Sequence, residues 1–387
     1  MPVLSRADDS IVGRWWWSVD RVMLTALLLL VGVGYVLAFA ATPATSLSLD
    51  DPNTIVMVRQ ILYLLASGLL MVGVSMLDLR HVKLAALAIG VVFLVLTGFT
   101  LVHGVVVDGG RRWIALPGFT IQPSEFLKPA LIIASAWLLA ERRRTPGFPG
   151  MFAAIGLNAI VVLILLRQPD VGTTALVLAT FFVQLFLDGL NPAFVGLGIA
   201  GFGIGGIAAF ELIAHVHKRV MLFLHPTKDK AYQAITALSA FANGGLWGRG
   251  PGEGQVKHYL PDARADFVFA VAGEEFGMFL CLGIIALYAV IVLRGLVRVL
   301  RETDPFAALA ATGLLTSFGL QAFINMASSL SMIPTKGMTL PFLSYGGSAV
   351  LATGLQMGFL LALTRRRSHA ERAADGLFGL GLQDRAV

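Results

Sequence analysis

Four carboxylates occur together in the stretch LPDARADFVFAVAGEEFG, which directly precedes the apolar run MFLCLGIIALYAVIVL. Asp266 comes just before aromatic and apolar residues, so it marks the expected start of a helix, where an aspartate can cap free N–H groups. Glu274 and Glu275 lie about two helical turns further along, which is too deep for capping. At least one of them is therefore expected to face the protein interior or a cavity, where it could have a functional role.

A second charged pair occurs in QPSEFLKP, at the beginning of another apolar run. Glu125 and Lys128 are three residues apart, so they share one face of a helix. A lone charge at the centre of a bilayer costs roughly 2.5–3.5 kcal/mol on insertion scales, and pairing lowers that cost. Two interpretations stay open: an ion pair that only locks the helices together, and a pair that lines a polar cavity.

Two further stretches combine helix breaks with charge. In RQPDVGTT, Asp170 lies in a turn beside Arg167, where capping of the next helix is the simplest interpretation. In PTKGMTLPFLSYGGS, repeated proline and glycine interrupt the helix at membrane depth. Such backbone must be buried in protein or line a water-filled cavity. It is either a re-entrant turn needed for packing, or an anion cradle formed by backbone amides and Lys336.

The elements that position these residues follow from the composition. Of 387 residues, 57% are hydrophobic and only 13% are charged, whereas soluble domains carry about 25% charged residues. We therefore predict an all-α polytopic membrane protein with about ten transmembrane helices. The single cysteine, Cys281, excludes an intramolecular disulfide. The expected spans lie near 22–41, 55–76, 84–107, 122–140, 151–166, 171–187, 192–214, 267–293, 306–328 and 341–363.

The distribution of lysine and arginine orients these spans with both termini in the cytoplasm. The first apolar run is too long for a signal peptide and follows three tryptophans typical of a membrane interface, so it is interpreted as an uncleaved span. The glycine-rich seventh span is expected to pack closely. The predicted organisation is a cytoplasmic tail over 1–21, a ten-helix domain over 22–364 and a cytoplasmic tail over 365–387. A long extracytoplasmic loop is expected over about 215–266, between the seventh and eighth helices.

Two segments expected outside the membrane are rich in basic residues: DGGRRWIALPGFTIQPSEFLK and the long loop. Long loops cross the membrane whatever their charge, but the same residues could form a site for phosphate or pyrophosphate. A transporter, a lipid-handling enzyme or a receptor would each fit such a surface. The sequence contains no nucleotide-binding loop, which argues against an ATP-driven pump, and no Cys/His pattern typical of a metal site.

The stretches RRWI…QPSEFLKP, RQPDVGTT, GGLWGRGPGEGQVKHYLPDARADFVFAVAGEEFG and PTKGMTLPFLSYGGS, in this order, resemble the SEDS family of cell-wall proteins. PTKG and GRGPGEG are more similar to the division member, FtsW, than to the elongation member, RodA. The resemblance implies a peptidoglycan glycosyltransferase that polymerises lipid II and releases undecaprenyl pyrophosphate. It also implies a class B penicillin-binding protein and other division proteins as partners, contact with membrane lipid and none with nucleic acid. The implied location is the bacterial inner membrane at the division septum.

The resemblance also assigns residues. It places the family's essential aspartate on Asp266, the Glu and Lys of its QPSE motif on Glu125 and Lys128, and the acid of its QPD turn on Asp170. The family usually has His-Thr before the essential aspartate, whereas this chain has Arg264 and Ala265. Arg264 is expected to keep a positive charge beside Asp266.

The mechanism expected from this resemblance uses one carboxylate as general base on the sugar 4-hydroxyl of an acceptor lipid II. The base is Asp266. Cations at the outer face, with Lys128, Arg219, Lys257 and Lys336 as candidates, would stabilise the leaving pyrophosphate, and a divalent cation (Mg or Mn) could share that task. Glu274 and Glu275 are expected to be polar supports in the cavity, Ser344 is a further cavity residue, and Asp262 is a solvated loop residue. The alternatives are a lipid II flippase and a non-catalytic division scaffold.

Overall fold

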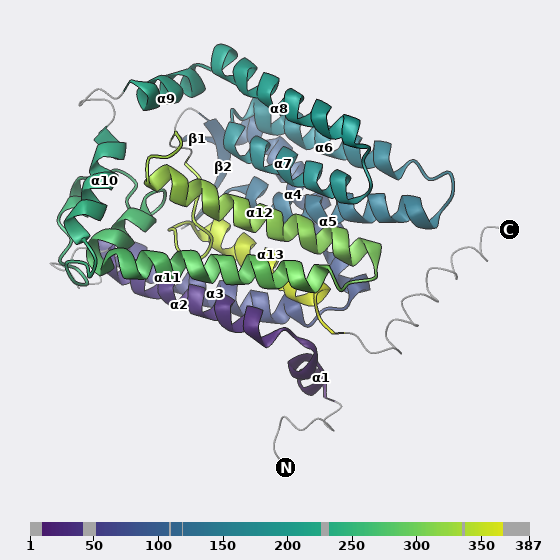
Figure 1. Ribbon diagram of the computed structural model, residues 1–387, viewed down its shortest axis with the longest axis horizontal. Helices are drawn as coiled ribbons and strands as arrows, with labels where there is room; N and C mark the ends of the chain where they lie inside the picture. The colour runs from purple at the N-terminus through teal and green to yellow at the C-terminus, as the bar shows by residue number, and fades with distance from the viewer. Residues whose placement is uncertain are drawn as a thin grey trace.

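The computed structural model describes residues 10–41, 52–107, 110–117, 119–225, 232–334 and 337–366. The described part of the chain is almost entirely helical, and Figure 1 shows its long helices lying side by side in one bundle. The helices and strands are α1 (Ile11–Ser18), α2 (Arg21–Ala40), α3 (Pro52–Ser75), α4 (Leu79–His103), β1 (Val105–Val107), β2 (Gly110–Leu116), β3 (Phe119–Ile121), α5 (Pro123–Arg144), α6 (Gly150–Arg167), α7 (Val171–Leu187), α8 (Pro192–Leu212), α9 (Ala214–Leu224), α10 (Tyr232–Gly244), η1 (Val256–Tyr259), α11 (Val268–Val299), α12 (Pro305–Ser329) and α13 (Gly347–Leu363).

Each of the ten predicted spans contains a helix. Within the described residues, seven helices are long and apolar enough to cross a membrane: α2, α3, α4, α6, α8, α11 and α12. Two more, α7 and α13, are apolar but shorter, and α5 carries charged residues in its first and last turns. The prediction of an all-α polytopic membrane protein is confirmed.

The structure departs from the predicted elements at several points. A small antiparallel sheet, in the order β1-β2-β3, follows α4, so the third span ends at His103 rather than near 107. Its first strand consists of three valines, whose branched side chains favour strands. The predicted loop over 215–266 contains α9, α10 and η1. The tenth helix begins at Gly347 rather than near 341, because the preceding residues, including Phe342 with a φ of 64°, are not helical.

The core of the bundle is formed around α12 and α13, most of whose side chains are buried. α13 packs tightly on α3: a Cβ added to Gly354 would lie 2.3 Å from Ser67 Oγ, and Ser67 donates a hydrogen bond to the carbonyl of Val350 at 2.7 Å. Small residues allow this close approach between membrane helices.

The expectation of close packing for α8 is wrong. None of the side chains described in its apolar window is buried. Most of its glycines have no neighbouring atom within 4 Å of an added Cβ, whereas Gly198 lies beside the ring of Phe182. Figure 1 shows α8 along the edge of the bundle, joined to α9 at one end. Glycine content alone therefore did not indicate a packed interface.

The long helix α11 is broken at Gly277, which has a φ of 76° and a ψ of −173°. The loop after α10 binds the exposed backbone at this break. Met278 N donates to Gly245 O at 3.0 Å, and Gly250 N donates to Glu275 O at 2.9 Å. The glycine-rich sequence GGLWGRGPGEG therefore lies where the backbone of this loop directly contacts the backbone of α11.

We expect Gly277→Ala to destabilise the protein. The alanine would hold a backbone conformation that is essentially restricted to glycine, which costs about 1–3 kcal/mol. Its Cβ would also lie 2.4 Å from Gly248 N and Leu246 O. Thermal unfolding in detergent measures the effect. Gly283→Ala is the matched control, because it lies in the same helix with nothing within 4 Å of an added Cβ. An equal melting temperature for Gly277→Ala and wild type would contradict the argument.

Candidate active site

A cavity of about 790 Å³ lies at the end of the bundle that carries the sheet and α9. Segments far apart in the sequence line it: β2, the first turn of α5, the turn between α6 and α7, α9, the turn before α11, and the non-helical segment 337–346. Its polar and charged lining includes Arg112, Gln122, Glu125, Lys128, Asp170, Thr173, Lys218, Arg219, Asp262, Asp266, Gln321, Thr339 and Tyr345.

The cavity brings together many of the residues predicted from the sequence. The predicted residues in its lining are Asp266, Glu125, Lys128, Asp170 and Arg219. Lys257, Glu275 and Ser344 are not among the lining residues, and Lys336 lies outside the described part of the chain. A single site therefore forms from four distant stretches.

Asp266 is half-buried in a turn just before α11. The helix begins at Val268 with Phe267 as its N-cap, and no side chain caps it, so the capping interpretation of Asp266 is wrong. The backbone N–H of Asp266 donates to Asp262 O at 3.0 Å. A Cβ added to Gly337 would lie 3.4 Å from Asp266 Oδ2. The carboxylate therefore lies against the backbone of the segment 337–346, inside the cavity lining.

Glu125 and Lys128 form the expected pair. Lys128 Nζ lies 2.9 Å from Glu125 Oε2, and the two residues are only 4% and 8% exposed, respectively. The helix starts with a proline in its first turn, followed by the acidic Glu125, an arrangement that suits a helix N-terminus. Lys128 also donates to Gln321 Oε1 at 3.0 Å. Both interpretations hold together, because the pair joins two helices and also lines the cavity.

Asp170 caps α7, accepting a hydrogen bond from Thr173 N at 3.1 Å, as the capping interpretation predicts. Its cationic neighbour is Arg112, at 3.8 Å from Arg112 NH1, rather than the adjacent Arg167. Arg112 also donates to the carbonyls of Gln168 and Pro169 and so fixes the sheet on the turn between α6 and α7.

Several residues that line the cavity were not singled out from the sequence. Arg112 and Lys218 belong to the two basic segments noted above, so their charge was a usable signal. Gln321 and Thr339 carried no signal in the sequence, because a single amide or hydroxyl in an apolar run is common in packed helices. Burial and the nearby Tyr63 raise the pKa of Tyr345, against the opposing effect of Arg59 and Arg264.

Glu274, Glu275 and Lys257 do not support the cavity as expected. Glu274 is fully buried and accepts hydrogen bonds from the backbone N–H groups of Gln255, Val256 and Lys257, at 2.8, 2.8 and 2.9 Å. Glu275 binds Lys257 Nζ, which also donates to Ala40 O at 2.7 Å. These charges fasten the loop after α10 to α11 and to the end of α2, so their contribution to the cavity is indirect.

Ser344 and Arg264 hold the turn that contains Asp266 through hydrogen bonds to neighbouring backbone. The Ser344 hydroxyl donates to Ala265 O and accepts a hydrogen bond from Leu340 N at 2.7 Å. Arg264 Nε donates to Ala41 O at 3.1 Å, at the end of α2. This hydrogen bond ties the turn before Asp266 to the end of α2.

The donor set around the cavity does not form a metal site from protein ligands alone. No group of three or more His, Cys, Asp or Glu side chains is placed to hold an ion among the described residues. Of the four cavity carboxylates, Glu125 and Asp170 are already paired with cations. Mg²⁺ commonly uses one or two carboxylates together with phosphate oxygens, so an ion in this cavity would need oxygens from a bound phosphate in addition to the protein carboxylates.

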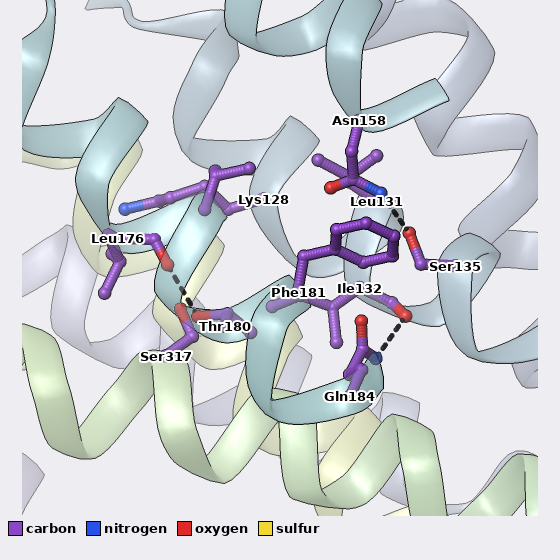
Figure 2. Close-up of a pocket in the computed structure, with 11 residues that line it drawn as sticks. Lys128, Leu131, Ile132, Ser135, Asn158, Leu176, Thr180, Phe181, Gln184 and Ser317 are labelled. Atoms are coloured by element: carbon purple, nitrogen blue, oxygen red, sulfur yellow. Dashed lines mark hydrogen bonds between the residues drawn. The ribbon is translucent and has the colours of Figure 1, made fainter. Parts of the chain in front are cut away.

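A second, much smaller pocket lies deeper in the bundle, and Lys128 borders both spaces (Figure 2). Its polar side chains are hydrogen-bonded to their surroundings: Asn158 Nδ2 donates to Ser135 Oγ at 2.8 Å, and Gln184 Nε2 donates to Ile132 O at 2.9 Å. Its volume of about 10 Å³ is enough for one water molecule.

The fold and the cavity together define a polytopic helical membrane protein with a large cavity, lined by charged side chains, at one end of its bundle. The family model for the cell cycle proteins FtsW, RodA and SpoVE matches residues 20–369. The chain belongs to this family, as the sequence motifs predicted.

Relatives and solved structures agree with this assignment. The chain is 42% identical to the probable peptidoglycan glycosyltransferase FtsW of Caulobacter vibrioides, over 98% of this chain and 97% of the relative. It is 32% identical to the stage V sporulation protein E of Bacillus subtilis, over 90% and 97%. RodA of Thermus thermophilus superposes with a TM-score of 0.67 at 26% identity, over 91% and 99%. A chain from a peptidoglycan synthase complex superposes with a TM-score of 0.73 at 27% identity, over 90% and 98%.

Proposed function

We propose that this chain is a peptidoglycan glycosyltransferase that polymerises lipid II into glycan strands and releases undecaprenyl pyrophosphate. The observation that carries the proposal is the position of Asp266, a half-buried carboxylate inside a large cavity lined with cations. Family membership supports the reaction class, because relatives over nearly the full length carry the name of this activity.

In this proposal Asp266 is the general base. It takes the proton from the 4-hydroxyl of the acceptor sugar as the oxygen attacks the anomeric carbon of the growing strand. The bond from that carbon to the lipid pyrophosphate breaks, and negative charge develops on the leaving group. Lys218 and Arg219 line the cavity on α9, and Arg112 lines it on β2. In this proposal these cations stabilise that charge, with Lys218 and Arg219 as the stronger candidates, because Arg112 NH1 already lies 3.8 Å from Asp170 Oδ1.

Two cations proposed from the sequence are weaker candidates. Lys128 already lies 2.9 Å from Glu125, which compensates its charge, and Lys257 is buried against Glu275, away from the cavity lining. Lys336 remains a candidate from its sequence position alone. We assign Lys128 to shaping the cavity and holding the substrate by a hydrogen bond rather than to carrying net positive charge.

The rival function is a lipid II flippase. A flippase would also need polar groups that a head group can reach from the inside, and the loops expected on that side carry mainly arginines that follow from the membrane topology. A non-catalytic scaffold would not need a buried ion pair and an aspartate gathered in one cavity. The geometry therefore favours an enzyme that acts at one face of the membrane.

We further propose that the cavity faces the outside of the bacterial inner membrane, with both termini in the cytoplasm and the protein located at the division septum. The basic residues between the spans support this orientation. A class B penicillin-binding protein is the proposed partner. The similarity to a chain from a complex described as coordinating polymerisation and crosslinking supports this choice.

The test is polymerisation of lipid II by the purified protein, with and without a cognate penicillin-binding protein whose own activity is blocked. Glycan strands from the wild-type protein are expected. If no partner or divalent cation restores strand formation, a leaflet-exchange assay with labelled lipid II distinguishes the flippase from the scaffold. Cell morphology on depletion distinguishes the two roles within the family, because filaments indicate division and round cells indicate elongation.

A further inference from the structure

Helix α12 presents two carboxamide side chains to the non-helical segment that forms one wall of the cavity. Gln321 Nε2 donates to Thr339 O at 2.9 Å, and Asn325 Nδ2 donates to Met338 O at 2.6 Å. The two side chains are four residues apart, so they lie one turn apart on the same face of the helix. One helix thus binds two consecutive carbonyls of a segment that has no regular structure of its own.

Asn325 makes a second contact, to the turn of the proposed base. The same Nδ2 donates to Asp266 O at 3.0 Å, so both N–H groups of the amide are directed at carbonyls of the site. Asn325 is only 2% exposed, and its Oδ1 has no hydrogen-bond partner in the described part of the chain. A buried acceptor without a hydrogen bond is destabilising, so the two donated hydrogen bonds must offset that cost.

The two carbonyls that accept hydrogen bonds from Asn325, those of Asp266 and Met338, belong to two segments that meet at the side chain of Asp266. A Cβ added to Gly337, next to Met338, would lie 3.4 Å from Asp266 Oδ2. The distance between the Asp266 carboxylate and the segment that contains Gly337 therefore depends on where the two backbone segments lie. Asn325 joins these two segments by its hydrogen bonds. A shift of about 1 Å in a reacting group can lower a rate about 100-fold.

We infer that Asn325 is a positioning residue, which holds the Asp266 turn and the segment 337–340 at a fixed separation. It acts through Asp266 without contacting substrate. This inference rests on the proposed glycosyltransferase function for its catalytic consequence. Its structural consequence does not depend on the reaction: without the Asn325 side chain, both segments should become more mobile.

The experiment compares Asn325→Ala with Gln184→Ala. Gln184 is a matched control because it is also a buried amide whose Nε2 donates to two backbone carbonyls. One is the carbonyl of Ile132 (Figure 2), and the other is that of Leu309. We expect similar losses of melting temperature in both variants. Only Asn325→Ala should lower kcat, by about 10- to 100-fold, with KM for lipid II within about twofold. Gln184→Ala should keep both constants within about twofold of wild type.

Hydrogen exchange provides a readout independent of catalysis. The amides of Asp266 and Leu340 are hydrogen-bonded in these two segments, so Asn325→Ala should speed their exchange while Gln184→Ala should not. If Asn325→Ala is not recovered folded, Asn325→Ser, which keeps one donor, replaces it.

Two results would overturn the inference: equal loss of kcat in both variants, or unchanged exchange of these amides in Asn325→Ala. A wild-type protein that makes no strands would contradict the proposed function instead. In that case the exchange measurement alone decides whether Asn325 holds the two segments.

Discussion

Asp266→Asn abolishes strand formation from lipid II while the variant still folds and reaches the membrane. The amide is nearly the same size as the carboxylate, so the turn and its backbone hydrogen bonds to Asp262 and Asn325 are expected to persist. It cannot accept the proton of the attacking hydroxyl. Loss of a general base costs typically 100- to 10,000-fold in rate. The measurement is glycan strand length and yield from purified protein, with the melting temperature recorded on the same samples.

Asp262→Asn is the control for this substitution. Asp262 lines the same cavity and lies four residues before Asp266, but it is exposed. Its replacement removes the same negative charge from the same turn, so any general electrostatic effect on substrate binding appears in both variants. We expect Asp262→Asn to retain most of the activity. Full polymerisation by purified Asp266→Asn would falsify the assignment of the base.

The second large effect concerns the buried pair of Glu125 and Lys128. Removing either partner leaves the other charge buried and uncompensated, which typically costs 3–5 kcal/mol of stability. We therefore expect Glu125→Ala and Lys128→Ala each to lower the melting temperature strongly. The double variant should lose less than the sum of the two, with a coupling of about 1–3 kcal/mol. A thermal double-mutant cycle in detergent measures this coupling.

An exposed ion pair provides the comparison. Arg144 NH2 lies 2.6 Å from Asp304 Oδ2, but the Arg144 side chain is 47% exposed. Exposed pairs contribute about 0–1 kcal/mol, so Arg144→Ala should change the melting temperature little. Strict additivity of Glu125→Ala and Lys128→Ala would show that the two side chains do not stabilise each other, whatever their separation.

How far the site could be predicted depended on how local its contacts are. The pairing of Glu125 with Lys128 followed from their spacing on one helix, and the cap formed by Asp170 followed from its position in a turn. The partner of Asp170 could not be predicted this way. Arg167 is its neighbour in the chain, but the cation beside it, Arg112, comes from β2, and only the folded arrangement of sheet and turn decides between them.

The roles of Glu274 and Glu275 show a second limit on what the sequence can predict. Their depth in an apolar helix correctly predicted that they are buried. Their partners are mostly backbone N–H groups of the loop after α10, and backbone groups are present at nearly every position in a chain. No pattern of side chains could therefore distinguish a carboxylate that faces a cavity from one that binds a folded loop. The transmembrane helices were easier to predict, because long apolar runs have few alternatives.

The position of the break in α11 also gives an estimate of how far Asp266 lies from the hydrocarbon core of the membrane. The helical segment after Gly277, residues 278–299, is about 33 Å long at 1.5 Å per residue, close to the roughly 30 Å of the hydrocarbon core. The segment before the break, 268–276, adds about 13 Å and ends near Asp266. If the longer segment spans the core, the proposed base lies in the head-group region or above it. A polyprenyl chain can then stay in the bilayer while its pyrophosphate and first sugar reach Asp266, so no lipid need leave the membrane for a bond to form.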